Sequence, residues 1–401
     1  MKKLGLLPKL IAGIAIGILI GLFLPESIVR IVVTFSSLFG SFLRFVVPIM
    51  IIAFVISGIS SLSHGAGKLL AITTILSYAS TVIAGLGAFA VVYNVFPTFI
   101  NSNMLNNISQ SNIEPLKPYF AISIPPMIDV TSAIVFSFMI GISISSLRNK
   151  KIGDTLYNVF DELSSIISLV LKKIVIPFIP LFIMGTFANM TYTGQVAKII
   201  SMLWKVFLIV ICLHTVCLLI QFICAGIIGK KNPLKLMKNQ VPGYVAALGT
   251  QSSAACIPVN SICAEKNGIS EEIRNFVIPL CSNIHMAGSV ITITCCVTAV
   301  LMMYNLPMSV EKMIPFIMTL GIAMVASPGV PGGSIMAALP FMTLIGISPE
   351  GTLASLLIAL HITQDSFGTA ANVSGDNAIA VIVDAIYKKF IKKTEEIVTE
   401  N

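Results

Sequence analysis

Residues 326–334 read Ala-Ser-Pro-Gly-Val-Pro-Gly-Gly-Ser, and residues 250–258 read Thr-Gln-Ser-Ser-Ala-Ala-Cys-Ile-Pro. Each polar stretch interrupts an apolar run near its middle, the first at about 313–347 and the second at about 242–263. Because proline, glycine and clustered hydroxyl residues interrupt a helix, each run is predicted to form two short helices joined by a nonhelical tip. At membrane depth such a tip is tolerated only where it lines a polar cavity.

The overall composition is that of an integral membrane protein. Of the 401 residues, 56% are hydrophobic and only 10% are charged, and the mean hydropathy is +0.95. Soluble proteins average roughly 25% charged residues, so most of this surface must face lipid. The eight cysteines lie in apolar segments without metal-ligand spacing, which excludes a secreted disulfide scaffold. The chain has no Gly-x-x-x-x-Gly-Lys-Ser/Thr loop, so ATP-driven transport is disfavoured.

The basic residues behind the net charge of +8 lie in loops between the apolar runs. Their distribution therefore indicates how the chain is oriented across the membrane. With the runs at 242–263 and 313–347 entering and leaving on one side, the positive-inside rule predicts that both termini are cytoplasmic. Residues 5–24 are predicted to be a first span, not a cleaved signal peptide. No nucleic-acid partner is expected. The cytoplasmic basic residues would be Lys2, Lys3, Lys68, Arg148, Lys150, Lys151, Lys230, Lys231, Lys235, Lys238, Lys266, Lys388, Lys389, Lys392 and Lys393, against Arg30, Lys117 and Lys312 outside.

Two further polar stretches, at 281–289 and 364–376, lie in the apolar runs that follow the two tips. We expect each to mark a broken helix. The order of tip and broken helix then repeats after about 76 residues. This order is typical of inverted structural repeats with a binding site at their centre.

Two carboxylates lie on one face of the last apolar run. Asp365, Thr369, Asn372 and Asp376 are spaced i, i+4, i+7 and i+11, which places them on one side of a helix. An unpaired charge at the bilayer centre costs at least ~2.5–3.5 kcal/mol, and no lysine or arginine precedes Lys388 in this run. One possibility is that hydrogen bonds from serine and threonine hydroxyls neutralise both carboxylates. The other is that the partners of the carboxylates are mobile, with a substrate ammonium group at one carboxylate and a metal cation, best sodium, at the other.

Four motifs in order, covering roughly 240–385, resemble those of the dicarboxylate/amino acid:cation symporters, the glutamate transporter family. Within that family, the sequence is similar to the bacterial sodium-coupled serine/threonine transporters. In chain order, the first motif is Ser252-Ser253 with Ala254-Ala255, the second is Met286-Ala287-Gly288, and the third is Gly329-Val330-Pro331-Gly332. The fourth is Gln364-Asp365-Ser366 together with the ending Asn372-Val373-Ser374-Gly375-Asp376.

The resemblance implies an all-α polytopic membrane protein of the elevator type, with eight transmembrane helices, two re-entrant helical hairpins and inverted repeats. It also implies a homotrimer in contact with membrane lipid. The implied domains are scaffold spans 1 and 2 in 1–68, transport-domain span 3 in 69–97, an extracellular connector with scaffold spans 4 and 5 in 98–196, and a transport-domain core in 197–401. This core would contain span 6, hairpin 1 at about 242–263, span 7, hairpin 2 at about 313–347 and span 8.

The implied function is symport of a small neutral amino acid (serine, threonine or alanine) with one or two sodium ions across the cell membrane; the chain is not expected to be an enzyme. Asp365 would bind the substrate ammonium, and Asn372 and Thr369 its carboxylate. One sodium ion would bind Asp376. The implied substrate residues are Gln251, Ser252, Ser253, Ser289, Val330, Gly332, Asp365, Gly368, Thr369 and Asn372, and the implied ion residues are Cys281, Asn283, His285, Ser327, Pro328, Asn372 and Asp376.

The sequence departs from the family pattern at two places. The family's Asn-Met-Asp-Gly-Thr is His285-Met286-Ala287-Gly288-Ser289, which removes an amide and a carboxylate near a deep sodium site that also uses span-3 hydroxyls, here matched to Ser77, Ser80 and Thr81. Gly368 stands where carriers of acidic amino acids have an arginine. His285 is either a hydrogen-bonded, space-filling imidazole or a titrating group. A proton-coupled or dicarboxylate-type carrier of the same fold, or a channel or receptor, are the alternative functions.

Overall fold

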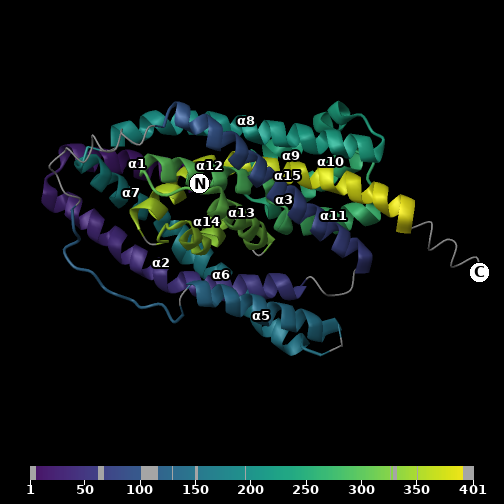
Figure 1. Ribbon diagram of the computed structural model, residues 1–401, viewed down its shortest axis with the longest axis horizontal. Coiled ribbons are helices and arrows are strands. Elements are labelled where there is room, and N and C mark those ends of the chain that lie inside the picture. The colour runs from purple at the N-terminus through teal and green to yellow at the C-terminus, as the bar shows by residue number, and fades with distance from the viewer. Residues whose placement is uncertain are drawn as a thin grey trace, which may run out of the picture.

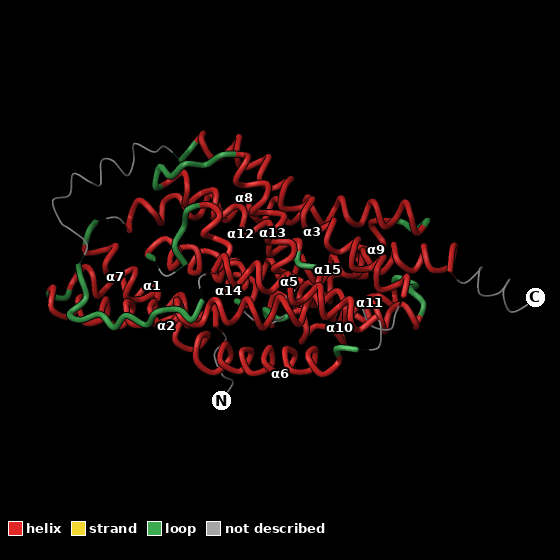
Figure 2. The backbone as a smooth tube through the Cα atoms, turned by 60° about the horizontal axis from the view of Figure 1, so that its bottom comes forward, coloured by secondary structure: helices red, strands yellow, loops and turns green. Residues whose placement is uncertain are grey.

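The computed structural model describes residues 6–61, 67–100, 116–128, 130–149, 152–194, 196–325, 327, 332–349 and 351–391. Throughout these ranges every regular element is helical, as predicted (Figure 1, Figure 2). The predicted site residues Pro328 and Val330 lie outside the described residues. The α-helices are α1 Leu6–Phe23, α2 Glu26–Ser61, α3 Gly67–Val95, α5 Val130–Asn149, α6 Asp154–Val170, α7 Ile176–Tyr192, α8 Val196–Gly229, α9 Pro233–Thr250, α10 Ser253–Lys266, α11 Glu271–Ile284, α12 Ala287–Met303, α13 Val310–Val325, α14 Gly333–Ala338 and α15 Thr352–Ile386.

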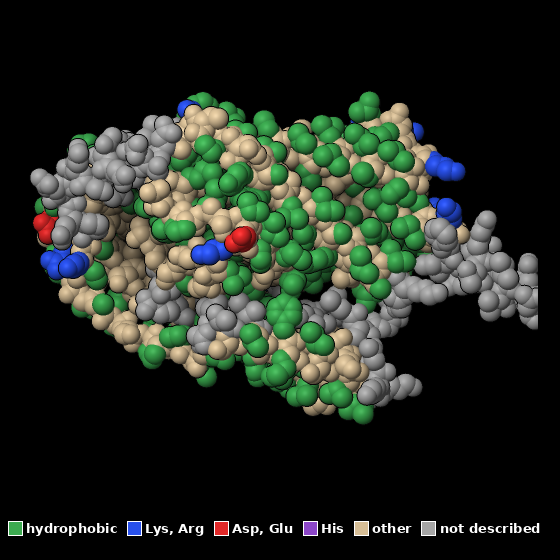
Figure 3. Space-filling view, in the orientation of Figure 1, with side chains coloured by type: hydrophobic (Ala, Val, Ile, Leu, Met, Phe, Trp, Pro, Cys, Tyr) green, Lys and Arg blue, Asp and Glu red, His purple; other side chains and the backbone are tan. Residues whose placement is uncertain are grey.

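Several helices are suited to a membrane. Within the described ranges, five helical stretches are long and apolar enough to cross a bilayer, judged by length and composition. On the face shown in Figure 3, hydrophobic side chains cover much of the surface and charged side chains gather mainly at its two ends. The five stretches are Glu26–Ser57, Leu69–Thr98, Asp154–Tyr192, Leu203–Gly229 and Glu271–Met303.

The first half of the chain packs through a row of glycines. Gly13, Gly17 and Gly21 lie on one side of α1, which runs along α7. A Cβ atom at Gly17 would be 2.4 Å from the carbonyl oxygen of Met184, so only glycine permits this approach of the two backbones. α2 packs in turn against α5, α6 and α7. The N-terminal helices therefore form one packed unit.

Helices α9 and α10 form the first predicted hairpin. Gln251 adopts a left-handed conformation (φ 54°) at the tip, and the Ser252 side chain caps the first turn of α10. The hairpin is longer than the predicted range of about 242–263, because α9 already begins at Pro233. There the side chain of Asn232 accepts hydrogen bonds from the first free backbone N–H groups of the helix, which fixes its start.

The break between α11 and α12 follows the prediction, and the run at 313–347 has described helices on both sides of its predicted tip. α13 is followed, across the tip, by α14 and a 3-10 turn at Leu339–Ile345. Gly332, with φ 73°, immediately precedes α14. α11 ends at Ile284, His285 is extended, and α12 begins at Ala287.

The predicted break at 364–376 is wrong. α15 continues without interruption from Thr352 to Ile386. The stretch contains no proline, and its glycines lie where neighbouring groups pass close: a Cβ atom at Gly375 would be 2.5 Å from Cε1 of His285. The polar residues of α15 therefore mark a buried face of a continuous helix.

Helices α12 and α15 form the centre of the second half. They pack against each other, and α3, α8, α9 and α11 surround them. Almost every residue of both helices is buried. Each polar side chain on α15 must therefore find its partner inside the protein, and these partners define the site.

Candidate functional site

Two of the three carboxylates of α15, Asp365 and Asp376, are buried and have no lysine or arginine partner among the described residues. Asp365 is 3% exposed and Asp376 is 0% exposed. Among the described residues, the ion pairs that contain lysine or arginine join Arg148 to Asp154, Arg274 to Glu265 and Lys388 to Asp384, and none includes Asp365 or Asp376. Because a buried charge requires compensation, these two positions are candidates for binding cations.

Asp365 contacts the tip of the second hairpin. Its Oδ2 accepts a hydrogen bond from the backbone N–H of Gly332 at 2.8 Å. The next residue, Ser366, accepts a hydrogen bond from Nε2 of Gln251 at 2.7 Å, which links the tip of the first hairpin to the same turn of α15. The structure thus brings both predicted tips to the helix turn that holds Asp365.

Asn372 stabilises the start of α12. Its Oδ1 accepts hydrogen bonds from the backbone N–H groups of Gly288 (2.8 Å) and Ser289 (3.3 Å), and its Nδ2 donates to Oγ of Ser289 (2.9 Å). Helix N-termini leave such N–H groups unpaired, and Met286 at the N-cap has no side-chain cap. Asn372 and Ser289, predicted to lie in one site, are therefore in direct contact.

Asp376 lies at the end of a hydrogen-bonded chain that spans three helices. Gln221 Nε2 donates to Ser80 Oγ (2.9 Å), Ser80 Oγ is 3.1 Å from His285 Nε2, and His285 Nδ1 is 3.1 Å from Asp376 Oδ1. A carboxylate only accepts, so these partners assign a proton to Nδ1 and an acceptor role to Nε2. The other carboxylate oxygen, Oδ2, is buried without a hydrogen-bond partner among the described residues.

The predicted span-3 hydroxyls surround the break between α11 and α12. Besides the Ser80 contact with His285, Ser77 Oγ lies 3.5 Å from Sγ of Cys281, and Thr81 Oγ1 accepts a hydrogen bond from the Met286 backbone at 3.3 Å. Sequence position alone suggested these three residues only approximately. The tertiary structure places all of them beside the predicted ion residues Cys281 and His285.

The remaining predicted residues differ in their surroundings. Ser327 is buried and its hydroxyl has no partner within the described part of the chain. Asn283 is exposed, and its side-chain amide donates to the Pro279 carbonyl of its own helix. Ser253 and Thr369 are buried.

Sequence reasoning missed two residues of α8 that reach the site. Gln221 contacts Ser80, and His214 Nε2 lies 3.0 Å from the carbonyl oxygen of Gly288 and 3.1 Å from Oγ1 of Thr292. These residues are seven positions apart in an apolar span, which places them on one helix face. That spacing is the signal by which they could have been found.

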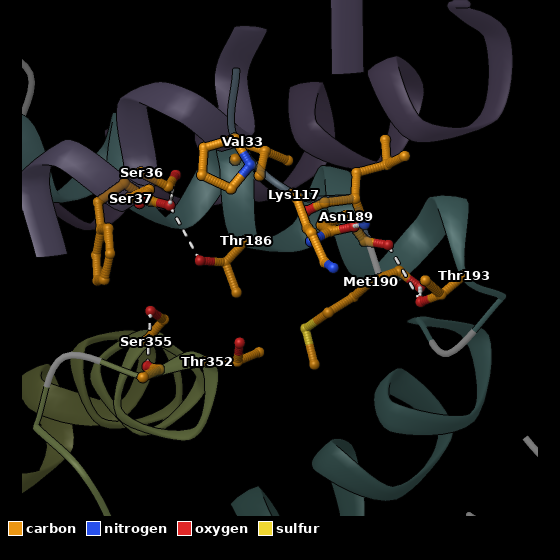
Figure 4. Close-up of a pocket in the computed structure, with 15 residues that line it drawn as sticks. Val33, Ser36, Ser37, Lys117, Thr186, Asn189, Met190, Thr193, Thr352 and Ser355 are labelled. Carbon is orange, nitrogen blue, oxygen red and sulfur yellow. Dashed lines mark hydrogen bonds between the residues drawn. The ribbon is translucent and has the colours of Figure 1, made fainter. Parts of the chain in front are cut away.

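A cavity of about 690 Å³ lies apart from these residues, between α2, α7 and the first turn of α15. Figure 4 shows its polar side chains facing a shared space. Its lining contains none of the predicted site residues. The polar residues at the lining are Ser36, Ser37, Lys117, Thr186, Asn189, Thr193, Thr352 and Ser355.

Comparisons with known proteins agree with the geometry. The model of the sodium:dicarboxylate symporter family matches residues 6–386. Proteins named serine/threonine transporter SstT from Acinetobacter baumannii strains AYE and AB0057 are each 26% identical to the chain over 397 residues, which cover 96% of this chain and 97% of the relative. The match spans every helix that contributes to the site. The chain therefore belongs to the sodium:dicarboxylate symporter family and is a membrane transporter, not an enzyme.

Proposed function

We propose that the protein is a secondary active symporter that imports small neutral amino acids, namely serine, threonine or alanine, together with sodium. The relatives named serine/threonine transporters support the substrate class. The observation that carries the proposal is the pair of buried carboxylates on α15, Asp365 and Asp376, without a lysine or arginine partner among the described residues. Mobile cations would then be their partners.

The amino-acid substrate would bind near the tips of both hairpins. Asp365 would pair with the ammonium group, because its Oδ2 already accepts from Gly332 and its other oxygen remains for the substrate. Asn372 and Thr369 would bind the substrate carboxylate, with Ser289 beside them. Gln251, Ser252, Ser253, Val330 and Gly332 would complete the pocket.

Sodium would bind at Asp376. Its Oδ2 is a buried carboxylate oxygen without a partner among the described residues, and hard cations prefer oxygen ligands. Backbone carbonyl groups of Cys281, His285 and Asn372 would supply further oxygens. A second sodium ion would use the tip around Ser327 and Pro328 together with the segment around Asn283, so that one or two ions accompany each substrate.

The proposed architecture has eight spans, two re-entrant hairpins and cytoplasmic termini, in a homotrimer in the cell membrane. The scaffold would comprise 1–68 and 98–196, and the transport domain 69–97 and 197–401. The packing of α1 and α2 against α7 and of α15 against α8, α9 and α12 supports this division. The cavity between α2, α7 and the start of α15 would leave room for the two parts to slide in an elevator movement.

One contact favours a second candidate. The resemblance places an asparagine at position 285, but this chain has a histidine there, and its imidazole lies 3.1 Å from Asp376. Because an imidazole can bind and release a proton near neutral pH, a proton could replace sodium as the coupling ion. A dicarboxylate substrate is disfavoured because Gly368 offers no cationic side chain.

The experiment is uptake of labelled serine into proteoliposomes with an imposed sodium gradient, an imposed proton gradient, or neither. Accumulation that requires the sodium gradient is the expected result. Accumulation with the proton gradient alone, in sodium-free buffer, would instead establish the proton-coupled alternative. Equal equilibration under all three conditions would contradict symport altogether.

A further inference from the structure

We infer that Thr292 of α12 hydrogen-bonds the side-chain hydroxyl of a serine or threonine substrate, and that His214 of α8 positions the Thr292 hydroxyl for this role. The inference rests on the proposed function and names the groups that would select among neutral amino acids. It is carried by contacts among α8, α12 and α15 that involve residues outside the predicted site.

Gly368 carries no side chain on the proposed substrate-binding face of α15. It lies between Asp365 and Thr369, the proposed ammonium and carboxylate ligands. A Cβ atom built at Gly368 would have Oγ1 of Thr292 as its nearest neighbour, at 3.4 Å, which is the lower limit of ordinary contact. Thr292 Oγ1 is therefore the side-chain group nearest to Gly368, and a substrate bound in the space beside Asp365 and Thr369 would lie close to it.

The position of Thr292 relative to this space is rigid. A Cβ atom at Gly288 would be only 2.4 Å from the carbonyl oxygen of Gly368, so α12 and α15 are in backbone contact one turn before Thr292. Thr292 is 0% exposed. Buried side chains between closely packed backbones keep one rotamer, which is what recognition of a small polar group requires.

His214 fixes the hydrogen bonds around the Thr292 hydroxyl. Its Nε2 is 3.0 Å from the Gly288 carbonyl oxygen, and because a carbonyl only accepts, Nε2 carries the proton. Thr292 Oγ1 donates to the same carbonyl at 3.0 Å and lies 3.1 Å from Nε2, so the imidazole N–H is shared between the carbonyl and Oγ1. A hydroxyl oxygen has two lone pairs, and the one that the imidazole does not use remains to accept a hydrogen bond from a substrate hydroxyl.

The second imidazole nitrogen supports this assignment. With the proton on Nε2, Nδ1 is an acceptor, and it is buried without a hydrogen-bond partner among the described residues. An unpaired buried acceptor is destabilising, so packing alone does not account for a histidine at this position. The subsite formed by Thr292 and His214 offers hydroxyl and imidazole groups and no cationic side chain, which suits a hydroxyl and not a carboxylate.

The test measures the serine preference of purified variants in proteoliposomes, defined as the ratio of kcat/KM for serine to that for alanine. Thr292→Val should lower this preference about tenfold, the equivalent of one hydrogen bond. Thr292→Ser should retain it. His214→Leu should lower it and His214→Gln should restore it, because the glutamine amide can donate to the Gly288 carbonyl in place of the imidazole.

Thr298→Val is the matched control. Thr298 lies on the same helix, is equally buried, and donates to the carbonyl four residues earlier at 2.8 Å. This variant should leave the serine preference unchanged. If Thr292→Val does not assemble, Thr292→Ala provides the same comparison.

Two results would overturn this inference but not the proposed function. The first is an unchanged serine preference in Thr292→Val or Thr292→Ala. The second is an equal loss of serine and alanine transport in His214→Leu, which would indicate a purely structural role for the imidazole. Failure of the wild-type protein to take up any neutral amino acid with a sodium gradient would overturn the proposed function, and this inference with it.

Discussion

Gly332 donates its backbone N–H to Oδ2 of Asp365 at 2.8 Å, although the two residues are 33 positions apart. The contact joins the left-handed residue before α14 to the middle of α15. One carboxylate oxygen therefore anchors the segment that precedes α14. Under the proposed function, the other oxygen binds the substrate ammonium, so the position of this segment and substrate binding are linked through a single side chain.

Neutralising Asp365 should separate these two roles. In Asp365→Asn the amide oxygen can still accept from Gly332, so folding and assembly should persist. The missing charge should weaken binding of the substrate ammonium by about 2–5 kcal/mol. The affinity for serine, measured by uptake or calorimetry, checks this. Asp384→Asn is the control, because Asp384 lies on the same helix and pairs with Lys388. Wild-type serine affinity in Asp365→Asn would contradict the assignment.

Acidic amino acids should be excluded. Gly368 provides no cation, so the side-chain carboxylate of aspartate or glutamate would be buried without a partner next to Thr292. We expect these amino acids to compete with labelled serine at least about 100-fold more weakly than unlabelled serine, which corresponds to roughly 3 kcal/mol for an unpaired buried charge. A competition series in proteoliposomes with the sodium gradient held constant measures this. Displacement by aspartate as effective as displacement by serine would refute the role of Gly368.

The number of coupled sodium ions should be one or two. Ala287 removes the carboxylate that the resemblance implies for a deep sodium site, and the hydroxyls of Ser77, Ser80 and Thr81 are directed to Cys281, His285 and the Met286 backbone. Neutral hydroxyls alone bind sodium weakly, whereas the proposed site at Asp376 retains a carboxylate group. In a reversal-potential experiment, the serine gradient that balances a known sodium gradient reports the ratio. A ratio of three would show that the deep site functions without its carboxylate.

The glycine contact between α1 and α7 should be sensitive to one methyl group. Gly17→Ala would place Cβ 2.4 Å from the Met184 carbonyl oxygen and should destabilise the protein by about 1–3 kcal/mol. Gly87→Ala in α3 is the control, because its Cβ has no neighbour within 4 Å, and a helical alanine should be neutral or stabilising by up to about 1 kcal/mol. Thermal unfolding in detergent compares the two. Equal melting temperatures would contradict the contact.

The sequence by itself determined the membrane class, the helix interruptions at Gln251 and His285, and the shared face of Asp365, Asn372 and Asp376. Each of these depends on a local cause. Proline and glycine stop helices, apolar runs of sufficient length enter lipid, and a period of 3.6 residues places polar side chains on one side.

The same local reasoning predicted a break at 364–376 that does not exist, because a cluster of polar residues looks alike in a broken helix and on a buried face of a continuous one. Only the tertiary structure decided between them, by surrounding α15 with partners from other helices. Gly332, Ser289 and His285 are hydrogen-bond partners of its polar side chains, and none of them is local to α15 in the sequence.

The contacts of His214 and Gln221 were likewise decided by tertiary structure. Their spacing of seven shows that they share a face of α8, but the pattern does not say which helix that face meets. Packing of α8 against α12 and α15 brings His214 to Thr292 and Gln221 to Ser80. Hydrogen bonds between residues distant in sequence depend on how apolar helix faces pack together, and in a chain whose spans are apolar on nearly all sides that arrangement has no local signature.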